Sequence, residues 1–310
     1  MHRLNYHLLV AAFGWLILSS CQSKTEATRT ETAAAAVAPD TAATLAAAAP
    51  SLARRFGPII SGGWMITSYL RVLRRTHSPQ IAADSISADV PVSLFIAPAA
   101  VAADSTLMQL NYNMHEGDEA SIYFRTGRQP NSLPLRSHSE TGKRYEISYR
   151  ISAADTALFL LEYSMRGKLI RQNRYQKTLV ASAQGTESNQ AFHQAVDYPL
   201  NKILVAGKYE GTDSLGHRVQ VTFSPTGYVS GIPFRKYHVM EDFIGPVIGD
   251  EIIFDMYTKH QHELAAVFRP DTLRLYTVLS ATEAAKDTTL SDSILVFRRG
   301  ILRYQLVRKR

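Results

Sequence analysis

Residues 145–151 read Tyr-Glu-Ile-Ser-Tyr-Arg-Ile, a stretch in which apolar or aromatic residues alternate with polar ones. Because successive side chains of a β-strand point to opposite faces, this pattern predicts a strand with one buried face. The chain continues with two further segments of strand composition, 157–163 and 173–180, separated by Arg166-Gly167-Lys168. Short strands joined by local turns predict antiparallel neighbours.

Similar segments recur along most of the chain after residue 56. In a first region, strands are also expected over 62–70, 90–96, 106–113 and 121–125, with a hairpin turn at 115–119. In a second region, strands are expected over 204–209, 218–223, 228–232, 236–242, 251–257, 263–268, 272–279, 293–297 and 302–307, with turns at 225–227, 270–271 and Arg299-Gly300. Short strands at a spacing of about 8–12 residues are typical of sandwiches and barrels. The sequence therefore predicts an all-β fold, an antiparallel meander closed into a barrel or packed as a sandwich.

The first 20 residues have the features of a bacterial export signal. Arg3 lies in a short polar start, and the apolar stretch 8–18 has about the length of a signal-peptide core and is too short to span a bilayer. Leu18-Ser19-Ser20-Cys21 follows and resembles the lipobox of bacterial lipoproteins, which implies cleavage before Cys21 and lipidation of its thiol. Cys21 is the sole cysteine of the 310 residues, so no internal disulfide can form. The alternative is an ordinary secretory leader with a coincidental cysteine.

Two low-complexity or polar segments separate the expected parts of the chain. Residues 21–55 are rich in Ala, Thr, Glu and Ser and nearly free of bulky apolar residues, which predicts a disordered tether after the lipidated cysteine. An alanine-rich helix is the alternative, and Pro39 and Pro50 oppose a long one. A connector is expected over 183–202, so the two β domains are expected over 56–182 and 203–310.

The two regions share a weak internal repeat. Gly63-Trp64 opens the first and Gly207-Lys208-Tyr209 the second, and each region has Asp-Thr before a late apolar strand, at 155–156 and 271–272. Each then ends on a basic strand with a tyrosine, Arg174-Tyr175-Gln176-Lys177 and Arg303-Tyr304-Gln305-Leu306. Three matches in the same order favour a duplicated domain.

A glycine two residues before an aromatic on the first strand, with a basic residue on the last strand, resembles the lipocalin signature. The resemblance implies that Trp64 and Tyr209 close their barrel ends, with Arg303 or Arg308 lying over Tyr209. Tyr209 departs from the tryptophan of that family, and Gly63 is an extra glycine beside Gly62. The whole chain also resembles lipoproteins of the Bacteroidota, in which such domains are abundant.

The sequence contains none of the common catalytic or nucleotide-binding motifs, neither Gly-x-Ser-x-Gly, His-Glu-x-x-His, P-loop nor dinucleotide fingerprint. No cofactor is expected. The net charge of +7 comes from scattered residues outside any nucleic-acid motif, so no nucleic-acid partner is expected. His260 and His262 are the best metal candidates, with His238 or Glu241 as a third ligand, if they lie on one strand face. The alternative is a polar hairpin turn.

Other candidates have ordinary structural alternatives. The acidic segment 115–119 is expected to be a solvated turn rather than a calcium site. The acid pairs at 241–242 and 250–251 would suit glycoside hydrolysis only if two carboxyls flanked one bond. Aromatic residues of the second region could line an apolar pocket, although small barrels more often fill their interiors with side chains. These aromatics are Tyr228, Phe234, Tyr237, Phe243, Phe254, Tyr257 and Phe268.

Three functions remain open from the sequence. The first is a non-enzymatic, membrane-anchored envelope lipoprotein that binds a hydrophobic small molecule; the second is an envelope protein-interaction module with a filled core; the third is a hydrolase. Two or more acyl chains on the cysteine would attach the protein stably to a membrane, so the membrane is the first expected partner. Gln22 follows Cys21, where the resemblance offers no aspartate retention signal, so the outer membrane is favoured.

Overall fold

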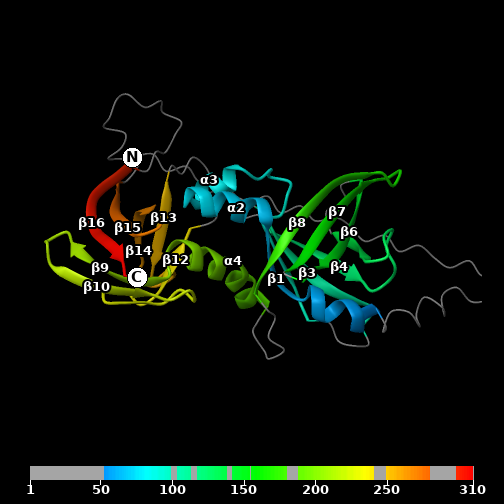
Figure 1. Ribbon diagram of the computed structural model, residues 1–310, viewed down its shortest axis with the longest axis horizontal. Coiled ribbons are helices and arrows are strands. Elements are labelled where there is room, and N and C mark those ends of the chain that lie inside the picture. The colour runs from blue at the N-terminus through cyan, green and yellow to red at the C-terminus, as the bar shows by residue number, and fades with distance from the viewer. Residues whose placement is uncertain are drawn as a thin grey trace, which may run out of the picture. The chain divides into compact units, whose positions relative to one another are not determined.

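The computed structural model describes residues 52–98, 103–112, 117–137, 142–153, 155–179, 188–240, 249–279 and 298–309. The leader, Cys21 and most of the expected tether lie outside these residues. Figure 1 shows two antiparallel sheets with a small number of helices. Each sheet has eight strands, which confirms the predicted all-β meander fold with two barrel-like domains.

The first sheet is a closed barrel in which neighbours in the chain are neighbours in space. It closes where β1 pairs with β8, with Trp64 opposite Lys177 and Ile66 opposite Tyr175. Its strands are β1 (Gly62–Ile66), β2 (Ser93–Ile96), β3 (Ser105–Asn111), β4 (Gly117–Tyr123), β5 (Ser132–Ser137), β6 (Lys143–Ile151), β7 (Thr156–Ser164) and β8 (Leu169–Leu179).

The second sheet has the strand order β11-β10-β9-β16-β15-β14-β13-β12. Its first strand pairs with its last, as in the first barrel, and a bridge between Tyr228 and Lys236 joins the short edges beside β11 and β12. Its strands are β9 (Gly207–Asp213), β10 (Arg218–Phe223), β11 (Val229–Ser230), β12 (Tyr237–Val239), β13 (Asp250–Phe254), β14 (His262–Phe268), β15 (Thr272–Leu279) and β16 (Arg298–Arg308).

Alternation along the strands decides which side chains enter the first barrel. Ile147 and Leu158 are fully buried, whereas their chain neighbours Glu146 and Phe159 belong to the outer face. The deep interior is apolar throughout and is formed by Ile122, Leu133, Ile147, Leu158 and Tyr175. Each such buried aliphatic side chain contributes about 1.5–3 kcal/mol to folding, which fixes the register of the meander.

Helices account for the main local departures from the predicted strands. The expected strand over 62–70 stops at Ile66, and α2 (Thr67–Thr76) begins there. Tyr69, Leu70 and Leu73 form one buried stripe of α2, a helical spacing that outweighs the strand propensity of the segment. The helix ends at His77, whose backbone is left-handed, and α3 (Pro79–Asp84) follows with Ser78 as its N-cap.

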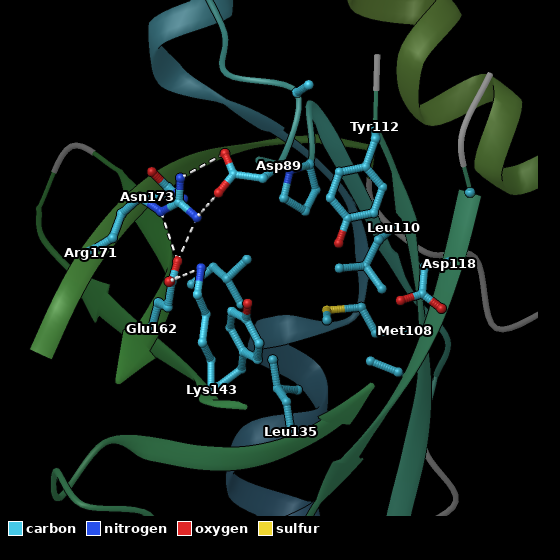
Figure 2. Close-up of a pocket in the computed structure, with 16 residues that line it drawn as sticks. Asp89, Met108, Leu110, Tyr112, Asp118, Leu135, Lys143, Glu162, Arg171 and Asn173 are labelled. Atoms are coloured by element: carbon cyan, nitrogen blue, oxygen red, sulfur yellow. Dashed lines mark hydrogen bonds and ion pairs between the residues drawn. The ribbon is translucent and has the colours of Figure 1, made fainter. Parts of the chain in front are cut away.

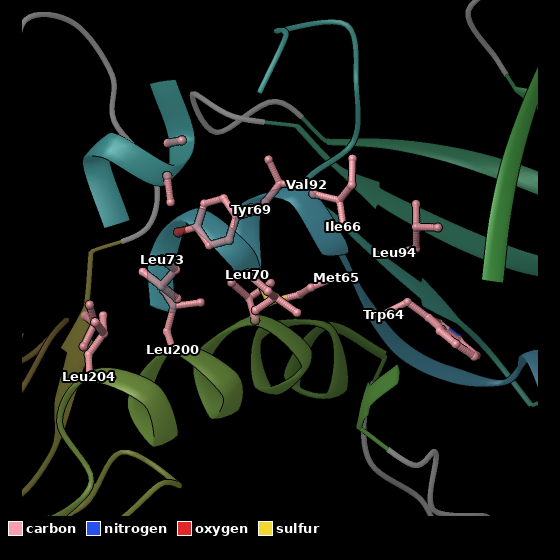
Figure 3. Close-up of a cluster of buried hydrophobic side chains, with 14 of the residues drawn as sticks. Trp64, Met65, Ile66, Tyr69, Leu70, Leu73, Val92, Leu94, Leu200 and Leu204 are labelled. Atoms are coloured by element: carbon pink, nitrogen blue, oxygen red, sulfur yellow. The ribbon is translucent and has the colours of Figure 1, made fainter. Parts of the chain in front are cut away.

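A longer helix occupies much of the expected connector. This is α4 (Ser188–Leu204), which packs on β1, β2 and β8. Leu200 and Leu204 of α4 lie below the buried stripe of α2 in Figure 3. A further helix over residues 52–60 includes the end of the expected tether and the expected start of the first domain.

One predicted turn is wrong, and one strand was not predicted. Arg299-Gly300 is part of β16 and pairs with β15 across a bulge, so the predicted hairpin turn is wrong. At the bulge, Gly300 stays within the strand without a turn. The amide of Ile301 donates to Thr277 Oγ1 (2.8 Å). β5 has leucine at alternate positions, but Pro134 lies between Leu133 and Leu135, and proline argues against a strand in a sequence. The strand expected over 293–297 lies outside the described residues.

Candidate functional site

The open half of the first barrel holds a cavity of about 700 Å³. Its inner wall is apolar and is formed by inward-facing residues of four strands, Met108, Leu110, Ala120, Leu135 and Leu160. In Figure 2, Met108, Leu110 and Leu135 surround the same cavity as a group of charged side chains. The volume is within the range of about 300–1,000 Å³ typical of small-molecule sites, so the first barrel is not a filled core throughout.

The rim carries a network of four charged side chains. Glu162 on β7 accepts from Lys143 Nζ (2.7 Å) on β6 and from Arg171 Nε (2.8 Å) on β8. Arg171 also donates two hydrogen bonds to Asp89, at 3.0 Å and 2.7 Å. The side chain of Glu162 is 4% exposed and that of Asp89 is 55% exposed. Two cations and two carboxylates therefore balance at the mouth of an apolar cavity.

Electrostatics keeps these groups charged. Burial raises the pKa of Glu162, but hydrogen bonds from Lys143 and Arg171 outweigh it and leave the pKa below its ordinary value. Hydrogen bonds from Arg171 and Ser87 lower the pKa of Asp89. The hydrogen bond to Glu162 raises the pKa of Lys143. The network is thus a set of full ion pairs at neutral pH.

A segment without regular structure lies over the cavity. It comprises residues 85–92 between α3 and β2, and Ala88, Asp89 and Pro91 line the cavity from above. The carbonyl of Pro91 accepts from the buried hydroxyl of Tyr175 (2.8 Å), and the Val92 amide donates to Asn111 (2.7 Å). The end of this strap near β2 is therefore fixed to the barrel, and Asp89 holds its middle.

Polar side chains also reach the cavity from the opposite wall. Tyr112, directly after β3, and Asp118 on β4 lie across from Arg171 in Figure 2. Burial, followed by the charge of Asp118, raises the pKa of Tyr112 to about 12. Tyr112 is consequently a neutral hydrogen-bonding group at the cavity.

The predicted barrel-closing residues make matching contacts in the two barrels. Trp64 is fully buried on β1 and donates from Nε1 to the carbonyl of Ile60 (2.7 Å), while Lys177 lies over its ring at 5.1 Å. Tyr209 on β9 donates to the carbonyl of Val205 (2.8 Å), and Arg308 lies over its ring at 5.4 Å. Both aromatics thus bond to the residue four positions earlier and carry a cation from the last strand of their barrel.

The equivalence extends to the neighbours of each pair. Lys177 donates to Ile59 (3.0 Å) and Arg308 to Leu204 (3.5 Å), each the residue before the carbonyl that accepts from the aromatic. Gly62 and Gly207 precede the aromatics by two residues and have φ of 113° and 154°, where a side chain is strained. This shared arrangement supports an internal repeat.

The structure corrects the register of the repeat. Lys177 corresponds to Arg308, because each lies opposite the closing aromatic. Tyr175 therefore corresponds to Leu306 and not to Tyr304, so the sequence match on the last strand is shifted by two residues. Arg303 is exposed and has the opposite parity to Arg308, and the structure does not bring it to Tyr209.

The two candidate histidines do not share a strand face. His260 lies in an exposed turn, and β14 begins only at His262, whose ring contacts Phe234. His238 pairs with Asp197 (3.2 Å), and Glu241 lies outside the described residues. Within the described ranges, no group of three His, Cys, Asp or Glu is placed to hold a metal ion.

The described acid pair, 250–251, does not form a facing carboxyl pair. Asp250 accepts from Ser78 Oγ (2.9 Å) and from the amide of Gln80 (3.0 Å). Glu251, the next residue of the strand, points to the other face. The pair 241–242 lies outside the described residues. Segment 115–119 is described only from Gly117, which begins β4.

The aromatics of the second region mostly pack on one another. Phe223 makes edge contacts with Tyr209 and Tyr237, and Phe234 stacks on Phe254 at 4.4 Å. Tyr228 and Tyr257 are exposed, and Phe243 lies outside the described residues. These contacts favour a core over a pocket for the buried aromatics.

The charged rim was not identified from the sequence. Its signal is the placement of charge on otherwise apolar inward positions, as in Leu158, Leu160 and Glu162 along β7. Arg171 and Tyr175 on β8 share that inward parity, and Lys143 does so on β6. The link to Asp89, 82 residues away, is tertiary and leaves no local pattern.

Comparison of the chain with protein-family models, with curated proteins and with solved structures returns no match. Among the described helices, none is long and apolar enough to cross a membrane.

Proposed function

We propose that this chain is a non-catalytic, lipid-anchored protein of the bacterial cell envelope whose first barrel binds a small molecule with a large apolar part. The observation that carries the proposal is the cavity of about 700 Å³ with an apolar wall and a polar rim. A filled core would be more stable, so an apolar cavity maintained in a small barrel is a cost that binding would justify.

The position in the envelope rests on the leader and Cys21. Cleavage before this residue and lipidation of its thiol would attach the mature chain to a membrane surface, with the outer membrane favoured. Mass analysis of the mature N-terminus checks this part. A diacylglyceryl cysteine at position 21 is expected, and an unmodified cysteine or a different N-terminus would contradict it.

Binding is tested with the full chain and a displaceable fluorescent fatty-acid probe, together with native mass spectrometry of protein purified from the envelope. A saturable site and a discrete extra mass that is lost on denaturation are expected. Ala120→Phe places a ring in the cavity and is expected to abolish binding. Ser121→Phe adds the same ring at the next position of β4, on the outer face, and serves as the control.

Leu135→Trp is a second cavity-filling variant, at a half-buried position. Circular dichroism melting checks that each variant is folded. Loss of binding in both cavity variants but not in Ser121→Phe supports the proposal. Equal binding in all three, or no binding by the unmodified chain, contradicts it.

A protein-interaction module is the second candidate, because one hairpin exposes three large apolar side chains. Met165, Leu169 and Ile170 at the β7–β8 turn are 58%, 40% and 54% exposed. Contiguous exposed apolar residues often mark contact surfaces. Crosslinking in intact envelopes that is lost in a Met165→Ser, Ile170→Ser variant would favour this candidate, above all with an empty cavity.

A further inference from the structure

The two carboxylates that contact Arg171 differ in how firmly they are held. Glu162 is buried within β7 and accepts from both Arg171 and Lys143. Asp89 belongs to the strap over the cavity, and its side chain is more than half exposed. Separating an ion pair that has one exposed partner costs less free energy than separating a buried one. Asp89 is therefore the partner that can leave.

Departure of Asp89 would leave a cationic site at the cavity mouth. The guanidinium of Arg171 would keep its orientation, because Glu162 fixes it from the other side. Lys143 has three N–H donors, and its ion pair with Glu162 uses one of them. With Glu162 retained, the cluster would carry one unbalanced positive charge, which a single anionic group would neutralise.

The position of this site fits the head group of an amphiphile. The two cations line the same cavity as the apolar wall, and Asp118 lies across the cavity from Arg171 (Figure 2). An anion is thus favoured on the Arg171 side and repelled on the Asp118 side. The planar fork of Arg171 also suits a carboxylate, since it already binds that of Asp89 through two hydrogen bonds.

We infer that the ligand of the first barrel is an amphiphile with a carboxylate head group, and that Asp89 occupies the head-group site until the ligand displaces it. Asp89 then acts as an internal competitor, and its release frees the middle of the strap over the cavity. The Tyr175–Pro91 hydrogen bond keeps the end of the strap near β2 in place. This inference rests on the proposed binding function and names its ligand class.

The test compares three probes with the same twelve-carbon chain, laurate, 1-dodecanol and dodecylamine, by calorimetry on the full-length protein. Asp89→Asn removes the competitor and is expected to bind laurate about fivefold more tightly, a modest factor because the displaced pair is exposed. Arg171→Gln is expected to weaken laurate binding at least tenfold, since it leaves a head-group carboxylate without its main partner. Binding of 1-dodecanol should change less than threefold in both variants, because an alcohol brings no charge to the pair.

Asp155→Asn is the matched control. Asp155 also pairs with an arginine of β8, Arg174 (3.6 Å), with similar exposure, but on the outside of the barrel. This variant should bind laurate as the unmodified chain does. Hydrogen exchange gives a second readout, in which laurate should increase exchange at residues 85–90 of the unmodified chain, while 1-dodecanol should not.

The outcomes separate this inference from the proposed function. Equal affinity for laurate and 1-dodecanol with no effect of Asp89→Asn, or preference for dodecylamine, overturns the head-group assignment and leaves an apolar binding site. No binding of any probe by the unmodified chain or Asp89→Asn overturns both. Tighter laurate binding by Asp155→Asn as well would assign the effect to net charge and overturn the role of Asp89.

Discussion

At the residue scale, each barrel pairs its closing aromatic with the cation that suits it. Arg308 donates to the hydroxyl of Tyr209 at 2.8 Å and 3.1 Å in addition to lying over the ring. The indole of Trp64 has no acceptor to offer, and its cation is Lys177, a compact charge that reaches the carbonyl of Ile59. Tyr209, which departs from the tryptophan of the lipocalin pattern, thus has an arginine partner that donates hydrogen bonds to its hydroxyl.

A second feature at this scale is the buried carboxyl of Glu251. Burial, with the nearby charges of Glu263 and Asp250, raises the pKa of Glu251 to about 7. The folded state therefore binds a proton that the unfolded state releases near pH 4.5. The stability that this proton confers is complete below about pH 4.5 and is lost as the pH rises through about 7.

Glu251→Gln should therefore stabilise the protein at pH 8 and leave it nearly unchanged at pH 4. We expect a gain on the order of 1–2 kcal/mol at pH 8, less than the full value of the pKa shift because solvent screens part of the carboxyl. Urea unfolding of both proteins across this pH range measures it. Glu263→Gln is the control and should lower the pKa of Glu251 rather than abolish its titration. A constant difference between Glu251→Gln and the unmodified chain at all pH values would refute the assignment.

At the element scale, a buried carboxylate holds a loop against the outside of the first barrel. Glu146 on β6 accepts from the amide of Arg128 (3.0 Å) and from Ser132 Oγ (2.6 Å). The guanidinium of Arg128 lies over the ring of Tyr163, and Gln129 donates to the hydroxyl of Tyr163 (3.2 Å). The loop between β4 and β5 is thus attached to the outer faces of β6 and β7 by a few polar contacts.

Glu146→Ala should release this loop with little effect on the barrel interior. Trypsin cleavage after Arg125 or Arg128 is expected to become at least tenfold faster, because cleavage requires local opening whose cost falls with the lost hydrogen bonds. Asp155→Ala, which removes an exposed carboxylate, should leave the cleavage pattern unchanged. Faster cleavage at all sites in Glu146→Ala would instead mean global destabilisation and would contradict the loop assignment.

Elements were predictable where one periodicity dominated. The sequences of β6 and β15 alternate, β7 is a nearly continuous apolar run, and the ranges of all three follow closely from the sequence. Thr67–Leu70 contains residues common in strands, and only the packing of Tyr69, Leu70 and Leu73 decides for a helix. In β16, the chain passes through Gly300 without turning, because a bulge accommodates it. Local sequence cannot distinguish such a bulge from a turn.

At the scale of the whole molecule, composition and strand spacing were sufficient to predict two barrels but not their different interiors. In the first barrel, Leu160 faces a cavity with charged groups at its mouth. In the second, Leu275 is fully buried in a core with interlocking aromatic rings. Both are leucines on inward positions of the seventh strand, so nothing in their local sequence separates a binding wall from a filled core.

The same substitution should therefore act differently in the two barrels. Leu160→Phe extends into free volume and is expected to change the free energy of unfolding by less than about 1 kcal/mol, while weakening probe binding. Leu275→Phe adds volume to a filled core and is expected to cost about 1–3 kcal/mol without affecting the probe. Native-state hydrogen exchange of slow amides in β7 and β15 measures each barrel separately, as a chain with two domains need not unfold in one step. Equal destabilisation by both substitutions would mean that the first barrel is as tightly filled as the second. That result would contradict a ligand-binding cavity in the first barrel.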